Sequence, residues 1–155
     1  MSNIVVLSDS HNRLPKTERF LTVLDEADYI FFLGDGGRDI DFLVEAYRSK
    51  LHYVFGNCDF RSGRREELVE IDGVKFFLTH GHDYGVKSGY LNLEYAAMEK
   101  GADCALFGHT HRPVIIRDGQ VTLINPGSIG YGGNYCYMSV YQGRFAAKAV
   151  TLTDI

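Results

Sequence analysis

Short apolar runs alternate with segments of helical hydrophobic spacing along the first two-thirds of the chain. The runs are rich in Val, Ile, Phe and Tyr, and each is followed at once by Gly, Ser or Thr. This pattern is typical of short strands that are buried on both faces. We therefore predict five buried strands, over residues 4–7, 29–33, 53–55, 74–78 and 104–107.

The segments between these runs carry apolar side chains at helical spacing. The first such segment has a proline near its start, where the fixed φ of proline suits a helix. The last is followed by Gly101, which is suited to a helix C-cap. We predict three helices, over residues 15–27, 39–49 and 88–100.

Glycine-containing dipeptides mark three hairpins. Asp72-Gly73 and Asp118-Gly119 favour type I′ turns, and Gln142-Gly143 marks a third turn. The mixture of hairpins and strand–helix–strand crossovers predicts an α/β protein of three or four layers, with two packed mixed β-sheets flanked by helices. The paired segments are residues 67–71 with 74–78, 114–117 with 121–124, and 135–141 with 144–151.

Each of the five apolar runs ends in a short segment that contains Asp, His or Asn. Loops beyond the carboxyl ends of strands in α/β sheets converge on one crevice, where ligands bind. Five of the six histidines fall in these loops, and only His52 lies outside them. The segments are Ser-Asp-Ser-His at 8–11, Gly-Asp at 34–35, Gly-Asn-Cys-Asp at 56–59, Thr-His-Gly-His-Asp at 79–83 and Gly-His-Thr-His at 108–111.

Imidazole and carboxylate donors together indicate a transition-metal site. Such a mixture suits Mn, Fe, Zn, Ni or Co better than Mg or Ca alone. The donors outnumber the needs of one ion, so we expect two metals. Any one of the five segments, taken alone, is more often an ordinary turn or a capped helix start. Their coincidence at five strand ends favours the metal site.

Composition and charge restrict the remaining function classes. A length of 155 residues fits one domain over residues 1–155, and 45% apolar content argues against disorder. The net charge of −4 argues against a duplex nucleic-acid partner, which requires a basic face. The three cysteines form no disulfide framework, and no apolar stretch reaches the length of a signal peptide or membrane span. We expect a cytoplasmic protein without a membrane partner.

The order of the motifs resembles the calcineurin-like metallophosphoesterase superfamily, and within it the small single-domain phosphodiesterases. The segment Asn125-Pro126-Gly127-Ser128 is also typical of the small members. The resemblance implies a four-layer α/β/β/α sandwich with a binuclear centre at the strand ends. The motifs that carry it are Asp9-x-His11, Gly34-Asp35, Gly56-Asn57-Cys58-Asp59, His80-Gly81-His82 and Gly108-His109-Thr110-His111.

The same resemblance implies a ligand set of seven residues. Two groups of three residues would each hold one metal, and Asp35 would bridge the two ions. The amide oxygen of Asn57 is a neutral ligand that limits negative charge in the site. The first group is Asp9, His11 and His111, and the second is Asn57, His80 and His109.

The charge of such a site suits a phosphate ester. Two divalent cations set against two aspartates and one hydroxide leave a small positive charge. Water between the metals would be acidic enough to act as a nucleophile near pH 7. We expect in-line attack of this metal-bridging hydroxide on a small phosphodiester. Mn²⁺ is the expected ion, and Ni²⁺, Zn²⁺, Fe or Co²⁺ also fit the ligand set.

The group that protonates the leaving oxygen is left open. Many larger family members have Gly-Asn-His where this chain has Cys58, although the cysteine is familiar among the small phosphodiesterases. The candidates are Cys58, His82, Asp59 and solvent. His82 fits a surface or supporting role equally well, and Asp39 fits a helix cap better than a catalytic role.

Other residues near the motifs have two interpretations. Arg13, Arg38 and Arg61 could contact phosphate, but solvated surface explains each of them. The glycine-rich segment 127–133, with Tyr131, could line the mouth of the site or only connect two strands.

Two further functions compete with a phosphodiesterase. One is a phosphomonoesterase or protein phosphatase, and protein phosphatases of this superfamily generally carry the histidine that is missing here. The other is a non-catalytic protein-binding scaffold, as in the retromer subunit of this fold. Aromatic sheet edges are compatible with a homodimer.

Overall fold

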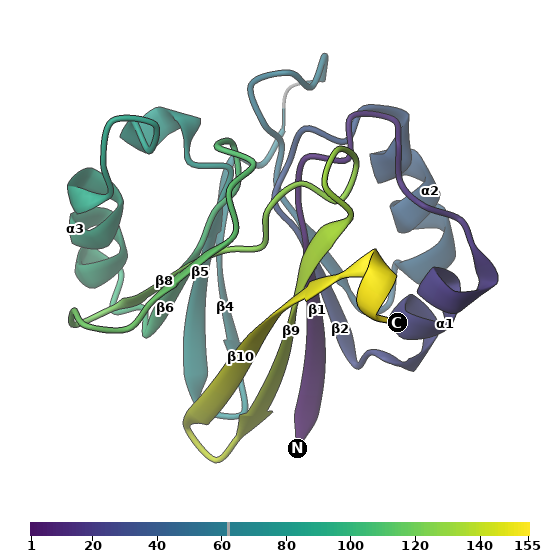
Figure 1. The fold of residues 1–155 in the computed structure, drawn as a ribbon. Coiled ribbons are helices and arrows are strands. Elements are labelled where there is room, and N and C mark those ends of the chain that lie inside the picture. Colours follow the sequence, from purple (N-terminus) through teal and green to yellow (C-terminus); the bar gives the residue numbers. More distant parts are fainter. Residues whose placement is uncertain (62) are drawn as a thin grey trace.

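The computed structural model describes residues 1–61 and 63–155 (Figure 1). The elements follow one another along the chain as strands, helices and two short 3₁₀ turns. They are β1 (Ser2–Leu7), α1 (Glu18–Glu26), β2 (Tyr29–Phe32), α2 (Arg38–Tyr47), β3 (Leu51–Tyr53), β4 (Glu66–Ile71), β5 (Val74–Thr79), η1 (His82–Tyr84), α3 (Leu91–Glu99), β6 (Cys104–Leu106), β7 (Val114–Ile116), β8 (Thr122–Asn125), β9 (Asn134–Tyr141), β10 (Arg144–Thr151) and η2 (Leu152–Asp154).

The strands form two five-stranded mixed sheets, in the orders β10-β9-β1-β2-β3 and β4-β5-β6-β8-β7. The pairs β1–β2, β2–β3, β5–β6 and β6–β8 are parallel, and the remaining pairs are antiparallel. Helices α1 and α2 cover the outer face of the first sheet, and α3 covers the outer face of the second (Figure 1). The predicted α/β/β/α arrangement is confirmed.

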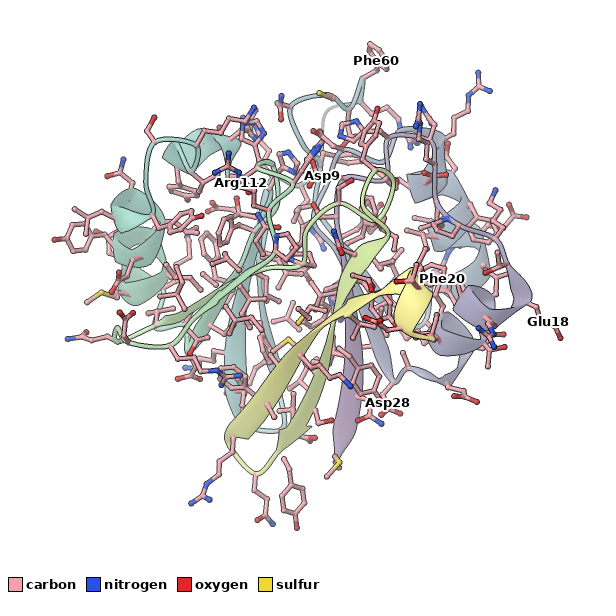
Figure 2. The ribbon with its side chains drawn as sticks, in the orientation of Figure 1. Asp9, Glu18, Phe20, Asp28, Phe60 and Arg112 are labelled. Atoms are coloured by element: carbon pink, nitrogen blue, oxygen red, sulfur yellow. The ribbon has the colours of Figure 1, made fainter. Side chains whose placement is uncertain are left out.

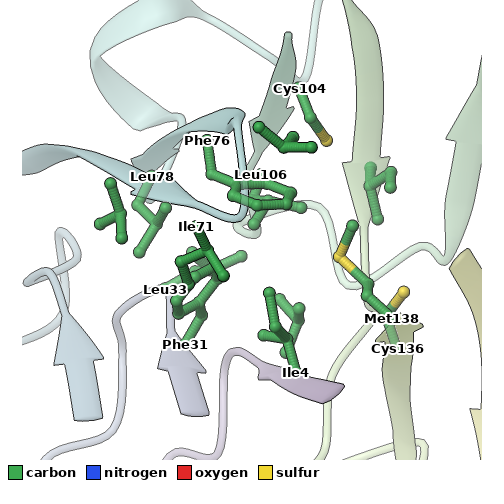
Figure 3. Packing of buried hydrophobic residues seen from close by; sticks show 14 of the residues in the cluster. Ile4, Phe31, Leu33, Ile71, Phe76, Leu78, Cys104, Leu106, Cys136 and Met138 are labelled. Carbon is green, nitrogen blue, oxygen red and sulfur yellow. The ribbon is translucent and has the colours of Figure 1, made fainter. Parts of the chain in front are cut away.

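Period-two alternation explains why both faces of β1 are apolar. Ile4 and Val6 point between the two sheets, whereas Val5 and Leu7 point toward α1 and α2. All four side chains are fully buried, because each face of the strand has a covering layer. The core between the sheets also contains Phe31, Leu33, Phe76, Leu78 and Met138 (Figure 3).

Two of the three helices begin later in the chain than their hydrophobic spacing predicts, whereas α2 begins at Arg38, one residue before the predicted start. Helix α1 begins at Glu18 because Thr17 is its N-cap, with the Thr17 hydroxyl accepting from the Phe20 N–H at 3.3 Å. The predicted start at Pro15 is therefore wrong by three residues. Helix α3 begins at Leu91 rather than at 88, and β3 ends at Tyr53 rather than spanning 53–55.

Two of the three predicted hairpin turns have the geometry of a type I′ turn. Asp72-Gly73 and Gln142-Gly143 both have positive φ at both residues, as this turn requires. The prediction for Asp118-Gly119 is wrong, since neither residue has positive φ. Strands β7 and β8 are antiparallel but are connected by five residues instead of two.

In the described part of the chain, no helix has the length and apolar character needed to cross a membrane.

Candidate metal centre

The loops that follow β1, β2, β3, β5 and β6 meet at one end of the sandwich. Asp9 lies in the first of these loops, between the two sheets (Figure 2). Backbone hydrogen bonds join the loops directly: the Asp9 N–H donates to Gly34 O at 3.0 Å, and the Gly108 N–H donates to His80 O at 2.9 Å. The predicted convergence of the strand-end loops is therefore present in the structure.

One group of candidate ligands is formed by Asp9, His11 and His111, whose ligand atoms lie within 4.8 Å of one another. Oδ1 of Asp9 is 3.2 Å from Nε2 of His111 and 3.6 Å from Nε2 of His11. Three donors of this kind, facing one point, could hold one divalent cation.

A second group is formed by Asp35, His80 and His109, again within 4.8 Å. Oδ2 of Asp35 is 3.1 Å from Nε2 of His80 and 3.9 Å from Nε2 of His11. Asp35 therefore lies between the two groups, as a bridging ligand would.

Asn57 lies on the loop that follows β3, and its side chain is exposed. Its amide nitrogen lies 3.6 Å from Sγ of Cys58, and the Cys58 N–H donates to Oδ1 of Asp35 at 2.8 Å. The loop thus brings Asn57 next to the second group.

The orientation of His80 leaves one ring nitrogen facing carboxylates. Nδ1 lies 2.7 Å from the carbonyl of Leu33, to which it donates, so the neutral ring has its lone pair on Nε2. That atom faces Asp35 at 3.1 Å without hydrogen-bond alignment. A lone pair and a carboxylate at this distance require a cation or a proton between them.

Orphaned polar atoms support the fit of a metal to these residues. Within the described residues, Oδ1 of Asp9, Nε2 of His11 and Nε2 of His80 are buried and have no hydrogen-bond partner. Buried polar groups are almost always paired, so three adjacent orphans need an explanation. A divalent cation at each group of ligands would satisfy all of them.

Without a cation, the protein compensates by shifting protons. Burial opposes charge on His80, but the carboxylates of Asp35 and Asp9 outweigh this effect and raise the pKa of His80. Burial also opposes charge on Asp35, yet His80 and the Cys58 N–H bring the pKa of Asp35 to about 2. The site therefore favours an imidazolium where a metal would otherwise sit.

The candidate ligands also have strained backbone conformations. Five of the seven have positive φ, between 47° and 71°, a region that non-glycine residues rarely adopt. Such strain persists only where surrounding structure holds it, and it clusters at functional sites. The five residues are Asp9, His11, Asp35, His109 and His111.

Asp59 holds two of the strand-end loops together. Its carboxylate accepts four backbone N–H bonds: from Gly56 at 2.7 Å, Asp35 at 2.9 Å, and Gly36 and Gly37 at 3.0 Å each. A carboxylate with both oxygens engaged in this way is suited to positioning Asp35 rather than to donating a proton.

His82 lies beside the second group of ligands. Its ring centroid is 5.5 Å from that of His80 and 6.1 Å from that of His109. Its Nε2 is 2.8 Å from Nη2 of Arg65, which also binds Asp83. Because a guanidinium only donates, Nε2 of His82 accepts, and the ring proton is on Nδ1.

The two remaining acid candidates differ in their proton affinity. Burial lowers the pKa of His82, and the positive charges of His80 and Arg65 add to this against the opposing effect of Asp83. Burial, followed by the charge of Asp35, raises the pKa of the Cys58 thiol. Cys58 is therefore a neutral thiol near pH 7.

Some residues at the site were not singled out from the sequence, or had no assigned role. Arg65 belongs to a stretch of mixed charge that reads as an exposed loop. The ring of Tyr131 stacks on that of His111, with centroids 5.7 Å apart and 18° between the planes. Ser128, in the motif typical of small members, donates from its hydroxyl to Asp9 O at 2.7 Å.

Two hollows flank the exposed loop that contains Phe60. One is lined by Asn12, Lys16 and Arg38 together with Phe60, and the other by Asn57, Arg65 and His82 together with Phe60. Phe60 itself projects away from the protein at the same end of the sandwich as Asp9 (Figure 2). The second hollow adjoins the centre, because Asn57 and His82 belong to its lining.

Comparison with solved structures finds the same fold in another protein. The crystal structure of Vps29 from Chaetomium thermophilum superposes with a TM-score of 0.80, covering 96% of this chain and 95% of that one. The two sequences are only 19% identical, so this similarity concerns the fold alone.

Sequence comparison identifies closer relatives. The probable metallophosphoesterase YsnB of Bacillus subtilis is 35% identical, over 82% of this chain and 75% of the relative. The phosphodiesterase YfcE of Escherichia coli is 32% identical, over 86% of this chain and 84% of the relative. Residues 2–141 match the model of the calcineurin-like phosphoesterase superfamily domain. The chain therefore belongs to the calcineurin-like phosphoesterase superfamily, and the family expected from its motifs is confirmed.

Proposed function

We propose that this protein is a binuclear-metal-dependent phosphodiesterase whose activity is carried by one domain spanning residues 1–155. The observation that carries the proposal is the pair of adjacent ligand groups, one around Asp9 and one around His80, with Asp35 between them. Family membership supports a metal-dependent hydrolase, and one relative is named a phosphodiesterase.

In this proposal each group of ligands holds one divalent metal. Asp35 would be a ligand of both ions. Mn²⁺ is the first choice, and Ni²⁺, Zn²⁺, Fe or Co²⁺ are compatible with the mixed donors. When bound, such metals acidify water into a nucleophile and neutralise charge on phosphoryl oxygens. The first metal would be held by Asp9, His11 and His111, and the second by Asn57, His80 and His109.

The residues around the ligands orient them. Leu33 O sets the ring of His80, and Asp59 fixes the backbone of Asp35. The Asp9 carboxylate accepts from the Ser8 hydroxyl at 2.5 Å and from the His109 N–H at 3.0 Å, both through Oδ2. Oδ1 of Asp9 is thereby left for the metal. Such supporting hydrogen bonds keep ligand geometry and donor strength constant.

His82 is our candidate for the group that protonates the leaving oxygen. To act as an acid the ring must be the imidazolium, with a second proton on Nε2, where Oδ1 of Asp83 lies 3.6 Å away. Its Nδ1–H, which is buried and has no partner in the described part of the chain, would then be the donor. Cys58, a neutral thiol on the opposite loop, is the alternative donor. Asp59 is better placed as a positioning residue, because four N–H groups occupy its carboxylate.

We also propose a cytoplasmic location. The three cysteines are free in the structure, with Cys58 exposed and Cys104 and Cys136 buried. Free thiols are typical of a reducing compartment.

The decisive experiment is a metal screen with two aryl substrates. Metal-free protein is loaded with each candidate ion, and turnover of bis(4-nitrophenyl) phosphate is compared with that of 4-nitrophenyl phosphate. We expect preference for the diester and binding of two ions per chain. Preference for the monoester would instead support a phosphomonoesterase. Absence of stoichiometric metal binding would support a protein-binding scaffold.

Asp35→Asn tests the bridging position. We expect this variant to lose most of its activity and one of its two ions, because a neutral amide holds two cations poorly. Asp118→Asn is the matched control, since Asp118 is exposed and outside the site. Full turnover by the Asp35 variant would disprove the bridging role.

A further inference from the structure

We propose that Arg13, held over the ring of Tyr131, binds an anionic group on the organic arm of the substrate. The enzyme would then favour phosphodiesters that carry a second negative charge. This inference rests on the proposed phosphodiesterase function and specifies its substrate class.

Arg13 is connected to the candidate metal centre through one aromatic ring. Its guanidinium carbon lies 4.7 Å from the centroid of the Tyr131 ring. The same ring is 5.7 Å from His111 and 5.4 Å from His11, measured between centroids. Tyr131 thus joins Arg13 to both histidines of the first ligand group.

The position of Tyr131 is set by backbone contacts to the Asp9 loop. The Tyr131 N–H donates to Ser128 Oγ at 3.0 Å, and Ser128 Oγ donates to Asp9 O at 2.7 Å. A side chain at Gly130 would collide with the carbonyl of Ser10, so the two loops are in direct contact. The backbone at Tyr131 is therefore fixed against the Asp9 loop, while its ring is exposed.

The backbone at Arg13 is anchored by hydrogen bonds on both sides of the residue. Its N–H donates to Ser10 O at 2.7 Å, and the next residue, Leu14, donates from its N–H to Asp39 at 3.1 Å. The backbone of Arg13 therefore belongs to the loop that carries His11, although its side chain is exposed.

The guanidinium of Arg13 is available to a ligand. In residues 1–61 and 63–155 no carboxylate lies within ion-pair distance of it, whereas Arg61, Arg64 and Arg65 are each paired with an acid. Stacking on an aromatic face leaves the N–H edge of a guanidinium free to donate. A planar, bidentate donor of this kind matches carboxylate and phosphate groups.

Charge explains why the preferred group is a second anion. The two metals neutralise the phosphoryl group that reacts, so Arg13 is not required for that charge. A guanidinium that sits beyond the histidine ligands adds positive charge at the rim of the site. The chemistry it recognises is a carboxylate or phosphate on the arm of the diester, which points toward His11 and His111.

The test uses two diesters with the same leaving group. Bis(4-nitrophenyl) phosphate has an uncharged second arm, and 4-carboxyphenyl 4-nitrophenyl phosphate has an anionic one. We expect the wild-type protein to have the higher kcat/KM on the carboxylated diester, chiefly through KM. Arg13→Gln should reduce this preference by roughly 10-fold or more, the effect of losing a charge-assisted hydrogen bond.

Variants of Tyr131 separate stacking from general disruption. Tyr131→Phe keeps the ring and should retain the preference, whereas Tyr131→Leu should reduce it. Arg144→Gln is the matched control, because Arg144 lies at the start of β10, at the other end of the sandwich (Figure 1).

Calorimetry gives a readout that is independent of turnover. It compares the binding of 4-carboxyphenyl phosphate with that of phenyl phosphate, and Arg13→Gln should weaken the binding of the carboxylated compound only.

The outcomes distinguish this inference from the function on which it rests. Hydrolysis of both diesters without preference, or a preference retained in Arg13→Gln, would overturn the inference alone. An equal loss of kcat/KM on both diesters in Arg13→Gln would assign Arg13 to the reacting phosphoryl group. That result would also overturn the inference. Failure of the metal-loaded protein to hydrolyse either diester would overturn the proposed function and the inference together.

Discussion

The carboxylate of Asp59 accepts a hydrogen bond from the backbone N–H of Asp35, with 2.9 Å between Oδ2 and N. The same carboxylate binds the N–H groups of Gly36, Gly37 and Gly56. It therefore joins the loop after β2 to the loop after β3. The position of the candidate bridging ligand depends on this side chain as much as on its own strand.

We predict that Asp59→Asn destabilises the protein and weakens metal binding. The side-chain NH₂ of the introduced amide would face backbone N–H groups that now bind a carboxylate oxygen. At least one backbone N–H would lose its acceptor, which costs about 1–3 kcal/mol of the free energy of unfolding. Loss of such a supporting contact lowers metal affinity by roughly 10- to 100-fold. Urea unfolding and metal titration measure the two effects. Asp28→Asn is the control, since the Asp28 carboxylate accepts the N–H of Asn3, away from the site.

The contribution of His80 to the stability of the metal-free protein should fall as pH rises. Burial opposes charge on His80, but Asp35 and Asp9 raise its pKa, so the protonated ring stabilises the fold. This contribution is fully present below the unfolded pKa of about 6.5 and is lost as pH rises through the folded value. Urea unfolding in chelator at pH 6 and pH 8.5 should show the fall, and His80→Gln should remove it.

Metal should reverse this pH dependence. The metal competes with protons for His80 and the other histidine ligands, so its affinity should rise with pH. Metal-loaded protein should therefore gain stability over the same interval in which metal-free protein loses it. The same change of unfolding free energy with pH in metal-free wild-type protein and in metal-free His80→Gln would contradict the assigned state of His80.

We predict that His82→Gln slows the hydrolysis of diesters with poor leaving groups. A general acid contributes about 100-fold or more when the leaving oxygen needs a proton, and much less when 4-nitrophenolate departs. The ratio of kcat for an alkyl ester to kcat for an aryl ester should fall in this variant. If Cys58→Ser lowers the ratio and His82→Gln does not, the thiol is the donor instead.

We predict that Phe76→Ala destabilises the core between the two sheets by about 3–5 kcal/mol. Phe76 is fully buried, and its ring lies edge-on to that of Phe31 from the other sheet, with centroids 5.7 Å apart. Phe60→Ala is the matched control, because Phe60 is 104% exposed and its truncation opens no cavity. Equal unfolding free energies for the two variants would contradict this assignment.

Local patterns in the sequence were sufficient to predict an α/β fold with two packed sheets and a metal site at the strand ends. Residues 4–7 are apolar at every position because β1 is covered on both faces, and that burial is visible as an unbroken run. Asp9 and His11 follow this run directly, and strand-end loops converge whenever strands are parallel. The members of a mixed imidazole and carboxylate site could therefore be predicted from residue types and their places after strands.

Contacts between distant segments were decided only by the tertiary structure. Arg13 reaches Tyr131 because β9 pairs with β1, which brings the loop before β9 beside the loop after β1. Asp59 was expected among the acid candidates, but its four backbone bonds depend on how two loops face each other. Spacing along the chain reports which face a residue occupies. It does not report which loop lies across from it, because that depends on the order of strands in the sheets.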